Sequence, residues 1–335
     1  MNVVNDELQQ APYIKTPLIR SSQLSQIVGC EVLLKIESLQ PSASFKSRGL
    51  GRLVQETLLN LPSGTTPKFF SSSGGNAGCA AAQAAQLYGC KCTVVVPSTA
   101  PAHMITRLRE RYAAEVIVHG TVWKEADDKV RELIAAYDGP AQYCHPFDNS
   151  LIWEGNSTIV DEIMDQLHEL GYSRTQLQAI SASVGGGGLY NGIVQGLQRN
   201  FPGGSRPTVV TCETTGTQKL FMSMKQGKRV VLDKITSIAS SLGADAVSPQ
   251  TFEYANKYPT LPVVVSDTQA VEACLKLLDT HRILVEPACG AALAPWYSSL
   301  VKLDLASDSV VVIIVCGGST VTLESMLKYK SQYTD

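Results

Sequence analysis

Four consecutive glycines, Gly185, Gly186, Gly187 and Gly188, follow an apolar run that is typical of a buried strand. Without side chains in the way, several backbone N–H groups can converge on one anion, and the helix expected over 189–197 adds its positive end. A glycine costs roughly 0.5 to 1 kcal/mol of ordering entropy, so four in a row indicate a compensating contact. The tetrad therefore predicts a phosphate site; the alternative is a flexible turn.

Common motifs for larger phosphate ligands are missing. The tetrad does not extend to G-x-G-x-x-G, and no G-x-x-x-x-G-K-[ST] segment occurs in the sequence. Dinucleotide and P-loop nucleotide sites are therefore disfavoured. The H-E-x-x-H motif of zinc proteases and the G-x-S-x-G motif of hydrolases are absent as well. A phosphate compound that contacts a lysine fits the sequence better than these ligands do.

The candidate lysine is Lys46, in the segment PSASFKSRG at 41–49, just before a helix expected over 50–61. Its amine stands between the aromatic Phe45 and the hydroxyl-bearing residues Ser44 and Ser47. By composition alone, a solvated lysine at the start of a helix is the simpler interpretation.

The elements that must position these groups are strands that alternate with helices. Seven apolar, β-branched runs predict strands, at 32–36, 68–72, 92–96, 116–118, 179–184, 208–212 and 310–315. Continuous apolar strands separated by helices are typical of parallel sheets covered on both faces, so we expect an α/β fold. Two open, mostly parallel twisted sheets fit better than one. We expect a small domain, 41–146, inserted into a large domain formed by 1–40 and 147–335.

Three glycine- and serine-rich segments, at 71–78, 184–188 and 316–319, follow predicted strands. In open α/β sheets, ligands bind at the carboxyl ends of the strands. We therefore expect the ligand in the cleft between the two domains.

Composition excludes several classes of protein. The 335 residues are 44% hydrophobic and 17% charged, with a net charge of −2, and no basic run offers a surface to nucleic acid. No apolar run is long enough to span a membrane, and the first residues do not resemble a signal peptide. The nine cysteines lie mostly in apolar stretches, which favours reduced thiols and a cytoplasmic location.

Taken together, six segments give the sequence a specific resemblance. It resembles the pyridoxal-phosphate (PLP) enzymes of the tryptophan-synthase β-subunit type, fold type II, and most of all the fungal catabolic L-serine/L-threonine dehydratases. The segments are PSASFKSRG at 41–49, SSGGNAG at 72–78, IWEG at 152–155, SVGGGG at 183–188, VEPACG at 285–290 and CGGS at 316–319.

The resemblance implies a role for each cofactor-binding residue. Lys46 would form the Schiff base, Phe45 would pack on the ring, and Gly185 to Gly188 would hold the phosphate. Asn76 would bond to the ring hydroxyl, and Cys316 would face the ring nitrogen. A neutral thiol can donate a hydrogen bond but does not stabilise a pyridinium as an aspartate does, which makes the ring a weaker electron sink.

The resemblance also implies a loop for the substrate carboxylate, formed by Ser72, Ser73, Gly75 and Asn76. An ordinary helix cap is the alternative. Gly74 stands where the similar serine racemases have a serine that acts as an acid and base, so racemisation should be slow. His145, near the end of the small domain, is expected to make a structural hydrogen bond.

A monovalent-cation site is a further implication of the resemblance. Glu213 would supply a carboxylate, and the carbonyl groups of Gly185, Thr217, Leu242 and Ala244 would complete the set. Oxygen-only ligands with one negative charge suit potassium. A solvated glutamate at the end of a strand is the alternative.

The implied reaction is PLP-dependent β-elimination of L-serine, and of L-threonine, to pyruvate or 2-oxobutanoate and ammonia. Lys46 would take the Cα proton of the amino-acid substrate. The family also suggests a homodimer, without nucleic-acid or membrane partners. A β-replacement synthase, a serine racemase of the same fold and a non-catalytic phosphometabolite sensor remain alternatives.

Overall fold

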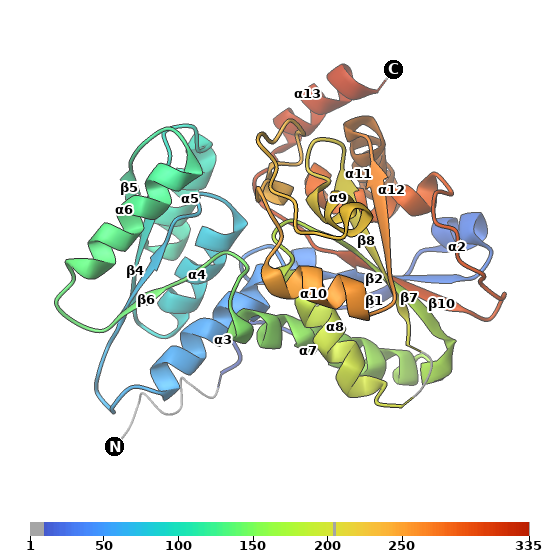
Figure 1. The fold of residues 1–335 in the computed structure, drawn as a ribbon, viewed down its shortest axis with the longest axis horizontal. Helices are drawn as coiled ribbons and strands as arrows, with labels where there is room; N and C mark the ends of the chain where they lie inside the picture. The colour runs from blue at the N-terminus through green and yellow to red at the C-terminus, as the bar shows by residue number, and fades with distance from the viewer. Residues whose placement is uncertain (1–9, 204–205, 335) are drawn as a thin grey trace. The chain divides into compact units, whose positions relative to one another are not determined.

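The computed structural model describes residues 10–203 and 206–334 and divides into two compact units. The smaller unit contains residues 10–14 and 40–155, and the larger contains residues 15–39 and those from 156 onward (Figure 1). The segment 41–146 lies wholly in the smaller unit. The boundary at 155/156 falls inside α7 (Ser150–Glu169), so one helix contributes to both units.

The smaller unit has a four-stranded parallel sheet in the order β5-β4-β3-β6. Its strands are β3 (Lys68–Ser71), β4 (Lys91–Val96), β5 (Glu115–Val118) and β6 (Ala141–Tyr143). Its helices are α3 (Lys46–Leu59), α4 (Asn76–Leu87), α5 (Ala102–Tyr112) and α6 (Trp123–Ala135).

Alternation along the strands divides the core of this unit between the two faces of the sheet. Phe69 packs with Ala- and Leu-rich parts of α3, α4 and α5, whereas its neighbour Phe70 packs against α6. Val94 and Val96 belong to the first cluster and Val95 to the second. Alternate residues of a strand point to opposite faces of the sheet, and here both faces are covered. Residues on both faces of such a strand are therefore mostly apolar, which gives the continuous apolar run seen in the sequence.

The larger unit has a six-stranded sheet in the order β1-β2-β10-β7-β8-β9, parallel except for β1. Its strands are β1 (Leu18–Arg20), β2 (Glu31–Ile36), β7 (Leu177–Ser183), β8 (Thr208–Thr214), β9 (Thr260–Val265) and β10 (Val310–Val315). All six residues of β10 are buried, as expected for a central strand.

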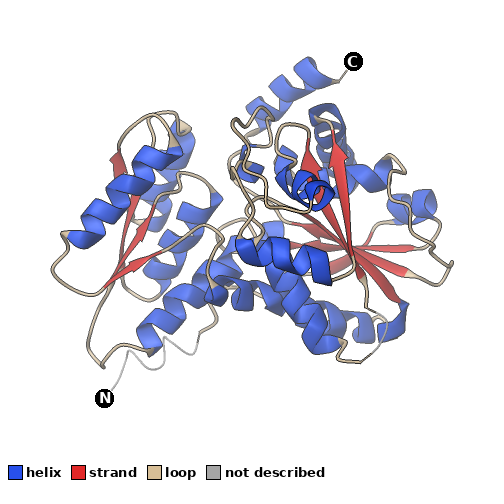
Figure 2. Cartoon of the chain, viewed as in Figure 1, coloured by secondary structure: helices blue, strands red, loops and turns tan. Residues whose placement is uncertain are grey.

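Helices cover both faces of this larger sheet, as Figure 2 shows. The helices not yet named are α2 (Ser22–Val28), α8 (Gly188–Asn200), α9 (Lys219–Gln226), α10 (Pro249–Lys257), α11 (Asp267–His281), α12 (Pro287–Tyr297) and α13 (Leu323–Tyr333), with 3-10 turns η1 (Glu37–Leu39), η2 (Arg174–Gln176) and η3 (Ser240–Leu242). Residues 287–296 of α12 are all buried, which makes this helix part of the core. Among the described residues, no helix is both long and apolar enough to cross a membrane.

The expected α/β fold with two mostly parallel sheets is confirmed, and each of the seven predicted strands is present within a few residues. Three further strands, β1, β6 and β9, were not predicted. Both β1 and β6 have only three residues. The third, β9, contains Pro262 and is mostly half-exposed at the sheet edge, where a missing N–H donor is tolerated.

Candidate active site

Lys46 is the first residue of α3 and follows a turn with a strained backbone. Ala43 has a φ of +64°, a conformation that residues with a side chain seldom adopt. Its N–H donates to the Gln40 carbonyl at 2.7 Å, and the Ser47 hydroxyl donates to the Ser42 hydroxyl at 2.7 Å. The turn is therefore closed onto the first turn of the helix, which fixes the backbone of Lys46.

The amine of Lys46 lies against the segment that follows β6. Its Nζ donates to the Pro146 carbonyl at 3.1 Å and lies 4.9 Å from the centre of the Phe45 ring. Nδ1 of the neighbouring His145 accepts the N–H of Asp148 at 2.8 Å, and burial lowers the pKa of this histidine. These contacts agree with the structural role expected for His145.

The segment predicted to bind a substrate carboxylate forms the start of α4. Gly75 is the N-cap, Asn76 is the first helical residue, and the Gly75 N–H donates to the Ser73 hydroxyl at 3.3 Å. A Cβ on Gly78 would lie 1.9 Å from the Ser73 carbonyl oxygen. Glycine at 78 therefore allows the loop to close tightly over the amino end of the helix, where N–H groups lack partners within the helix.

The hydroxyl of Ser72, a residue predicted to bind the substrate carboxylate, has hydrogen-bond partners within the smaller unit. This fully buried hydroxyl donates to Oδ1 of Asp127 at 2.9 Å and lies 3.0 Å from the Tyr143 hydroxyl, which also bonds to Asp127. Arg131 donates to the other carboxylate oxygen at 2.9 Å. The Ser72 side chain thus anchors the loop to α6, and the substrate-binding roles of Ser72, Ser73, Gly75 and Asn76 stay predictions.

We expect Asp127→Asn to lower the free energy of unfolding by about 1 to 3 kcal/mol at pH 7, because it removes the negative charge and one of the two carboxylate oxygens that accept from buried Ser72, half-buried Tyr143 and exposed Arg131. Burial raises the pKa of Asp127, but hydrogen bonds from Tyr143, Ser72 and Arg131 outweigh it, so this pKa lies below its usual range. The stabilisation is therefore present at neutral pH and is lost as the pH falls through the lowered pKa.

Urea unfolding of wild type and variant at several pH values tests this expectation. The difference should be largest near pH 7 and shrink below about pH 4. Asp128→Asn, one residue on and 55% exposed, is the matched control and should change stability by less than about 0.5 kcal/mol. Equal effects of the two variants would contradict the anchoring role of Asp127.

In the larger unit, the glycine tetrad connects the end of β7 to the start of α8. Gly187 has a φ of +100°, and a Cβ there would lie 1.9 Å from Oγ1 of Thr251. The Gly186 carbonyl accepts the N–H of Ser248 at 2.9 Å, and the Gly188 carbonyl accepts Nδ2 of Asn156 at 3.0 Å. The loop is thus held firmly through its carbonyl groups.

The N–H groups of this loop remain available. Within the described part of the chain, no hydrogen bond engages the N–H of Gly186 or of Gly187. Both lie at the amino end of α8, which has 13 residues and a positive N-terminal dipole. Two such donors at a helix start form a site for an anion such as phosphate.

Cys316 lies at the same edge of the larger sheet. It follows β10 directly, and β10 is the neighbour of β7. Its Sγ lies 3.6 Å from Oγ of Ser183, the last residue before Val184 and the tetrad. The larger unit therefore brings together two of the predicted cofactor-binding segments, whereas Lys46 and the 72–76 loop belong to the smaller unit.

Three residues that hold the tetrad were not predicted from the sequence. Asn191, Ser248 and Thr251 bond to one another, and the last two also contact Gly186. Only Asn191 carried a usable signal, since it lies one helical turn after Gly187. Ser248 and Thr251 are about 60 residues away, and nothing in the local pattern of α10 distinguishes them from an ordinary helix start.

The predicted potassium site holds a side chain instead. Nζ of Lys219 donates to the carbonyl oxygens of Thr217 and Leu242, at 2.9 and 2.7 Å, and lies 3.7 Å from Glu213. Three of the five predicted ligands therefore surround an ammonium group. Among its contacts in the described part of the chain, this ammonium group makes no hydrogen bond to the carbonyl groups of Gly185 and Ala244. The donor set does not support a potassium ion beside Lys219.

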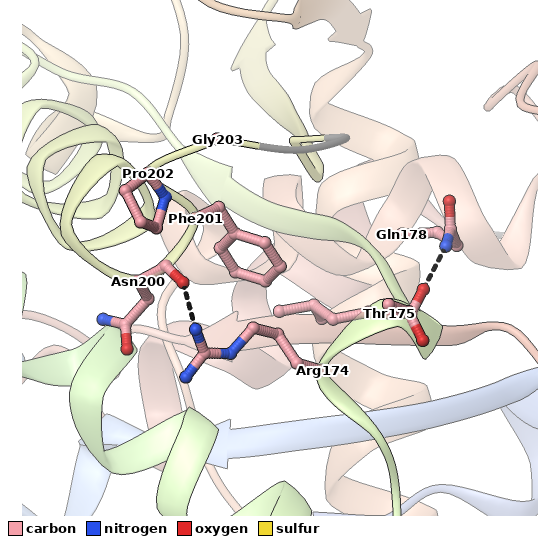
Figure 3. A pocket seen from close by; sticks show the side chains of 8 residues that line it. Arg174, Thr175, Gln178, Asn200, Phe201, Pro202 and Gly203 are labelled. Carbon is pink, nitrogen blue, oxygen red and sulfur yellow. Dashed lines mark hydrogen bonds between the residues drawn. The ribbon is translucent and has the colours of Figure 1, made fainter.

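A hollow of about 260 Å³ elsewhere in the larger unit is lined by Arg174, Phe201 and neighbouring residues (Figure 3). It lies at the amino end of β7, whereas the tetrad follows the carboxyl end. Its polar groups are engaged locally, with Arg174 donating to the Asn200 carbonyl at 2.6 Å. The hollow is therefore separate from the candidate cofactor site.

Comparison with known proteins identifies the class of this chain. A family model described as "Pyridoxal-phosphate dependent enzyme" matches residues 10–317. The chain belongs to this family, as its resemblance indicated. PLP presents a phosphate and an aldehyde on an aromatic ring, and the residues fit both groups. The N–H groups of Gly186 and Gly187, which have no partner among the described residues, suit the phosphate, and the amine of Lys46 beside Phe45 suits the aldehyde.

Several proteins to which the chain is similar are serine and threonine dehydratases or ammonia-lyases. The catabolic L-serine/threonine dehydratase of Saccharomyces cerevisiae is 44% identical over 94% of this chain and 89% of its own length. The L-serine dehydratase/L-threonine deaminase of Mus musculus is 41% identical over 97% of each chain. The solved structure of a fungal L-serine ammonia-lyase from Rhizomucor miehei superposes with a TM-score of 0.88 at 32% identity, covering 97% of this chain and all of the other.

Proposed function

We propose that this chain is an L-serine and L-threonine ammonia-lyase that releases pyruvate or 2-oxobutanoate and ammonia. The observation that carries this proposal is the tetrad itself. Two N–H donors that no described residue engages, those of Gly186 and Gly187, lie at the amino end of α8, on the sheet edge that also carries Cys316. The relatives named above support the amino-acid substrates.

Different residues of this chain would bind different groups of the cofactor. The tetrad would hold the cofactor phosphate, Cys316 would meet the ring nitrogen, and Asn76 would meet the ring hydroxyl. When bound, PLP supplies a conjugated ring that stabilises the charge formed when Cα loses its proton. A cysteine thiol, unlike a carboxylate, does not stabilise a protonated ring nitrogen, which favours prompt loss of the β-hydroxyl over longer-lived side reactions.

The amine of Lys46 would move the proton. Its Nζ takes the Cα proton of the substrate, while Ser73 and the N–H groups at the start of α4 hold the substrate carboxylate. This grip sets which Cα bond can break. Across the whole reaction the water lost from Cβ is balanced by the water that releases ammonia, so L-serine gives pyruvate and ammonium without any oxidant or reductant.

Gly74 separates this proposal from a racemase of the same fold. Glycine has no side chain that could return a proton to the opposite face of Cα. The position is also crowded, since a Cβ there would lie 3.1 Å from Val96 Cγ1 and from Ala100 Cβ. Maize serine racemase superposes with a TM-score of 0.82, but at 23% identity this likeness shows the fold alone.

A direct assay tests the proposed function. Purified holoenzyme should form 2-oxo acid and ammonia in equal amounts from L-serine and L-threonine, and far more slowly from D-serine. Chiral analysis of the remaining serine measures racemisation, and added sulfide measures β-replacement. If D-serine formed faster than pyruvate, or if sulfide diverted most of the product to cysteine, the ammonia-lyase proposal would be wrong.

We further propose that residues 41–146 act as the substrate-binding domain and that the remainder, 1–40 and 147–335, is the PLP-binding domain. The compact unit formed by residues 40–155 supports this division, because it contains both Lys46 and the 72–76 loop. A homodimer and a cytoplasmic location stay predictions.

A further inference from the structure

A buried ammonium group occupies the place where the sequence predicts a metal ion. The Lys219 side chain is fully buried, and its Nζ is surrounded by the Thr217 carbonyl, the Leu242 carbonyl and Oε1 of Glu213 at 2.9, 2.7 and 3.7 Å. Such a set of oxygen ligands, with one negative charge, is what an alkali cation takes in proteins. An ammonium group matches potassium in charge and closely in radius.

Glu213 explains why a positive charge is needed at this point. Its side chain is 2% exposed and accepts the N–H groups of Leu220 and Phe221, at 3.0 and 2.8 Å, at the start of α9. A buried carboxylate without an opposite charge is strongly destabilising. Lys219 supplies that charge from the first residue of the same helix, so the chain carries its own counter-ion.

The ammonium group also joins two segments that support the glycine tetrad. Thr217 lies in the turn after β8, and Leu242 is the last residue of η3. This 3-10 turn lies directly against the tetrad, because a Cβ on Gly185 would lie 3.1 Å from the Ser241 carbonyl oxygen and 3.5 Å from Cα of Leu242. Any shift of η3 would therefore move the wall behind Gly185.

We propose that Lys219 is a tethered cation, which replaces a bound monovalent metal ion and keeps the phosphate-binding loop in its working geometry. The proposal has two consequences. The wild-type protein needs no potassium, and removal of the lysine side chain creates a potassium site. Lys219 acts here as a positioning residue, since it reaches the cofactor site only through η3 and Gly185.

The wild-type enzyme provides the first test. Its melting temperature and its dissociation constant for PLP should be the same in potassium chloride and in tetramethylammonium chloride at equal ionic strength, because the tetramethylammonium ion is too large for the pocket. A rise in melting temperature with potassium, and not with tetramethylammonium, would overturn the proposal. The PLP measurement rests on the proposed function, whereas the melting temperature does not.

Two variants provide the second test. Lys219→Ala leaves an oxygen-lined space beside Glu213, and in tetramethylammonium chloride its melting temperature should fall by about 10 °C. Its dissociation constant for PLP should rise at least tenfold. Potassium should restore most of both losses. Lys219→Met fills the space with an apolar side chain. Its melting temperature and its affinity for PLP should fall by as much as those of Lys219→Ala, but potassium should not restore them.

Controls separate a tethered cation from an ordinary buried lysine. Lys225→Ala, an exposed lysine on the same helix, should behave as wild type in both salts. Glu213→Gln combined with Lys219→Met removes both charges and should melt at a higher temperature than Lys219→Met alone. If potassium does not restore Lys219→Ala, or if the double variant is the less stable, the proposal is wrong.

Discussion

Lys46→Ala should lower the turnover of L-serine by about 10⁴-fold or more, because the chain loses both its covalent anchor for PLP and its base for the Cα proton. The visible absorbance that marks a lysine-bound cofactor should vanish as well. Lys46 is the natural candidate for both roles, since its turn is closed through Ser42 and Ser47 and its amine lies beside Phe45.

Two further variants make the Lys46 result specific. Lys46→Arg keeps a positive charge but should be as inactive as Lys46→Ala, because a guanidinium remains protonated at working pH. Lys124→Ala, at a side chain that is 78% exposed in the same unit, should retain wild-type turnover. Turnover of Lys46→Ala within about tenfold of wild type would exclude Lys46 as the base.

Gly187→Ala should raise the dissociation constant for PLP by at least about 100-fold, a loss of roughly 3 kcal/mol. Two costs add here. A side chain at φ +100° is strained, by about 1 to 3 kcal/mol, and the new Cβ would meet Oγ1 of Thr251 at 1.9 Å. The loop must move to relieve this clash, and its movement displaces the N–H groups that would hold the phosphate.

Equilibrium titration of apoenzyme with PLP measures the effect of Gly187→Ala. Gly203→Ala is the control, because a Cβ there meets nothing within 4 Å and Gly203 lies outside the tetrad. The control should bind PLP as tightly as wild type. Unchanged affinity of Gly187→Ala would show that the tetrad does not hold the phosphate, even if the enzyme remained active.

Much of the fold could be predicted because the strands are continuous apolar runs. A continuous apolar run such as 310–315 is expected in a strand that is buried on both faces. Helical periodicity between such runs then indicates that the strands are parallel and covered by helices. Short or irregular elements lack that signal. A three-residue strand such as β6 has no period to detect, and Pro262 in β9 argues locally against a strand that the sheet edge nonetheless accepts.

Site residues could be predicted where they belong to a short, recognisable segment. They could not be predicted where their role depends on a contact with a residue far away in the sequence. The tetrad and Cys316 share a sheet edge, as expected for segments that follow parallel strands. In contrast, the hydroxyl of Ser72 is bound by Asp127, 55 residues away, and no local pattern reveals this pair.

The same limit applies to the cation site. Lys219 resembles any solvated lysine at a helix start until the fold encloses it with Glu213 and Leu242. The boundary between the two units at 155/156 was equally hidden, because it falls inside the continuous helix α7, whereas the boundary at 39/40 lies next to the predicted start of the small domain at residue 41.

Reduction with borohydride, followed by peptide mapping, tests most directly whether Lys46 is the residue that binds the cofactor. Reduced holoenzyme should yield one peptide that carries the mass of the reduced cofactor, attached at Lys46, and the Lys219 peptide should be unmodified. Attachment of the cofactor to any other lysine, or a holoenzyme in which no lysine is modified, would contradict this assignment.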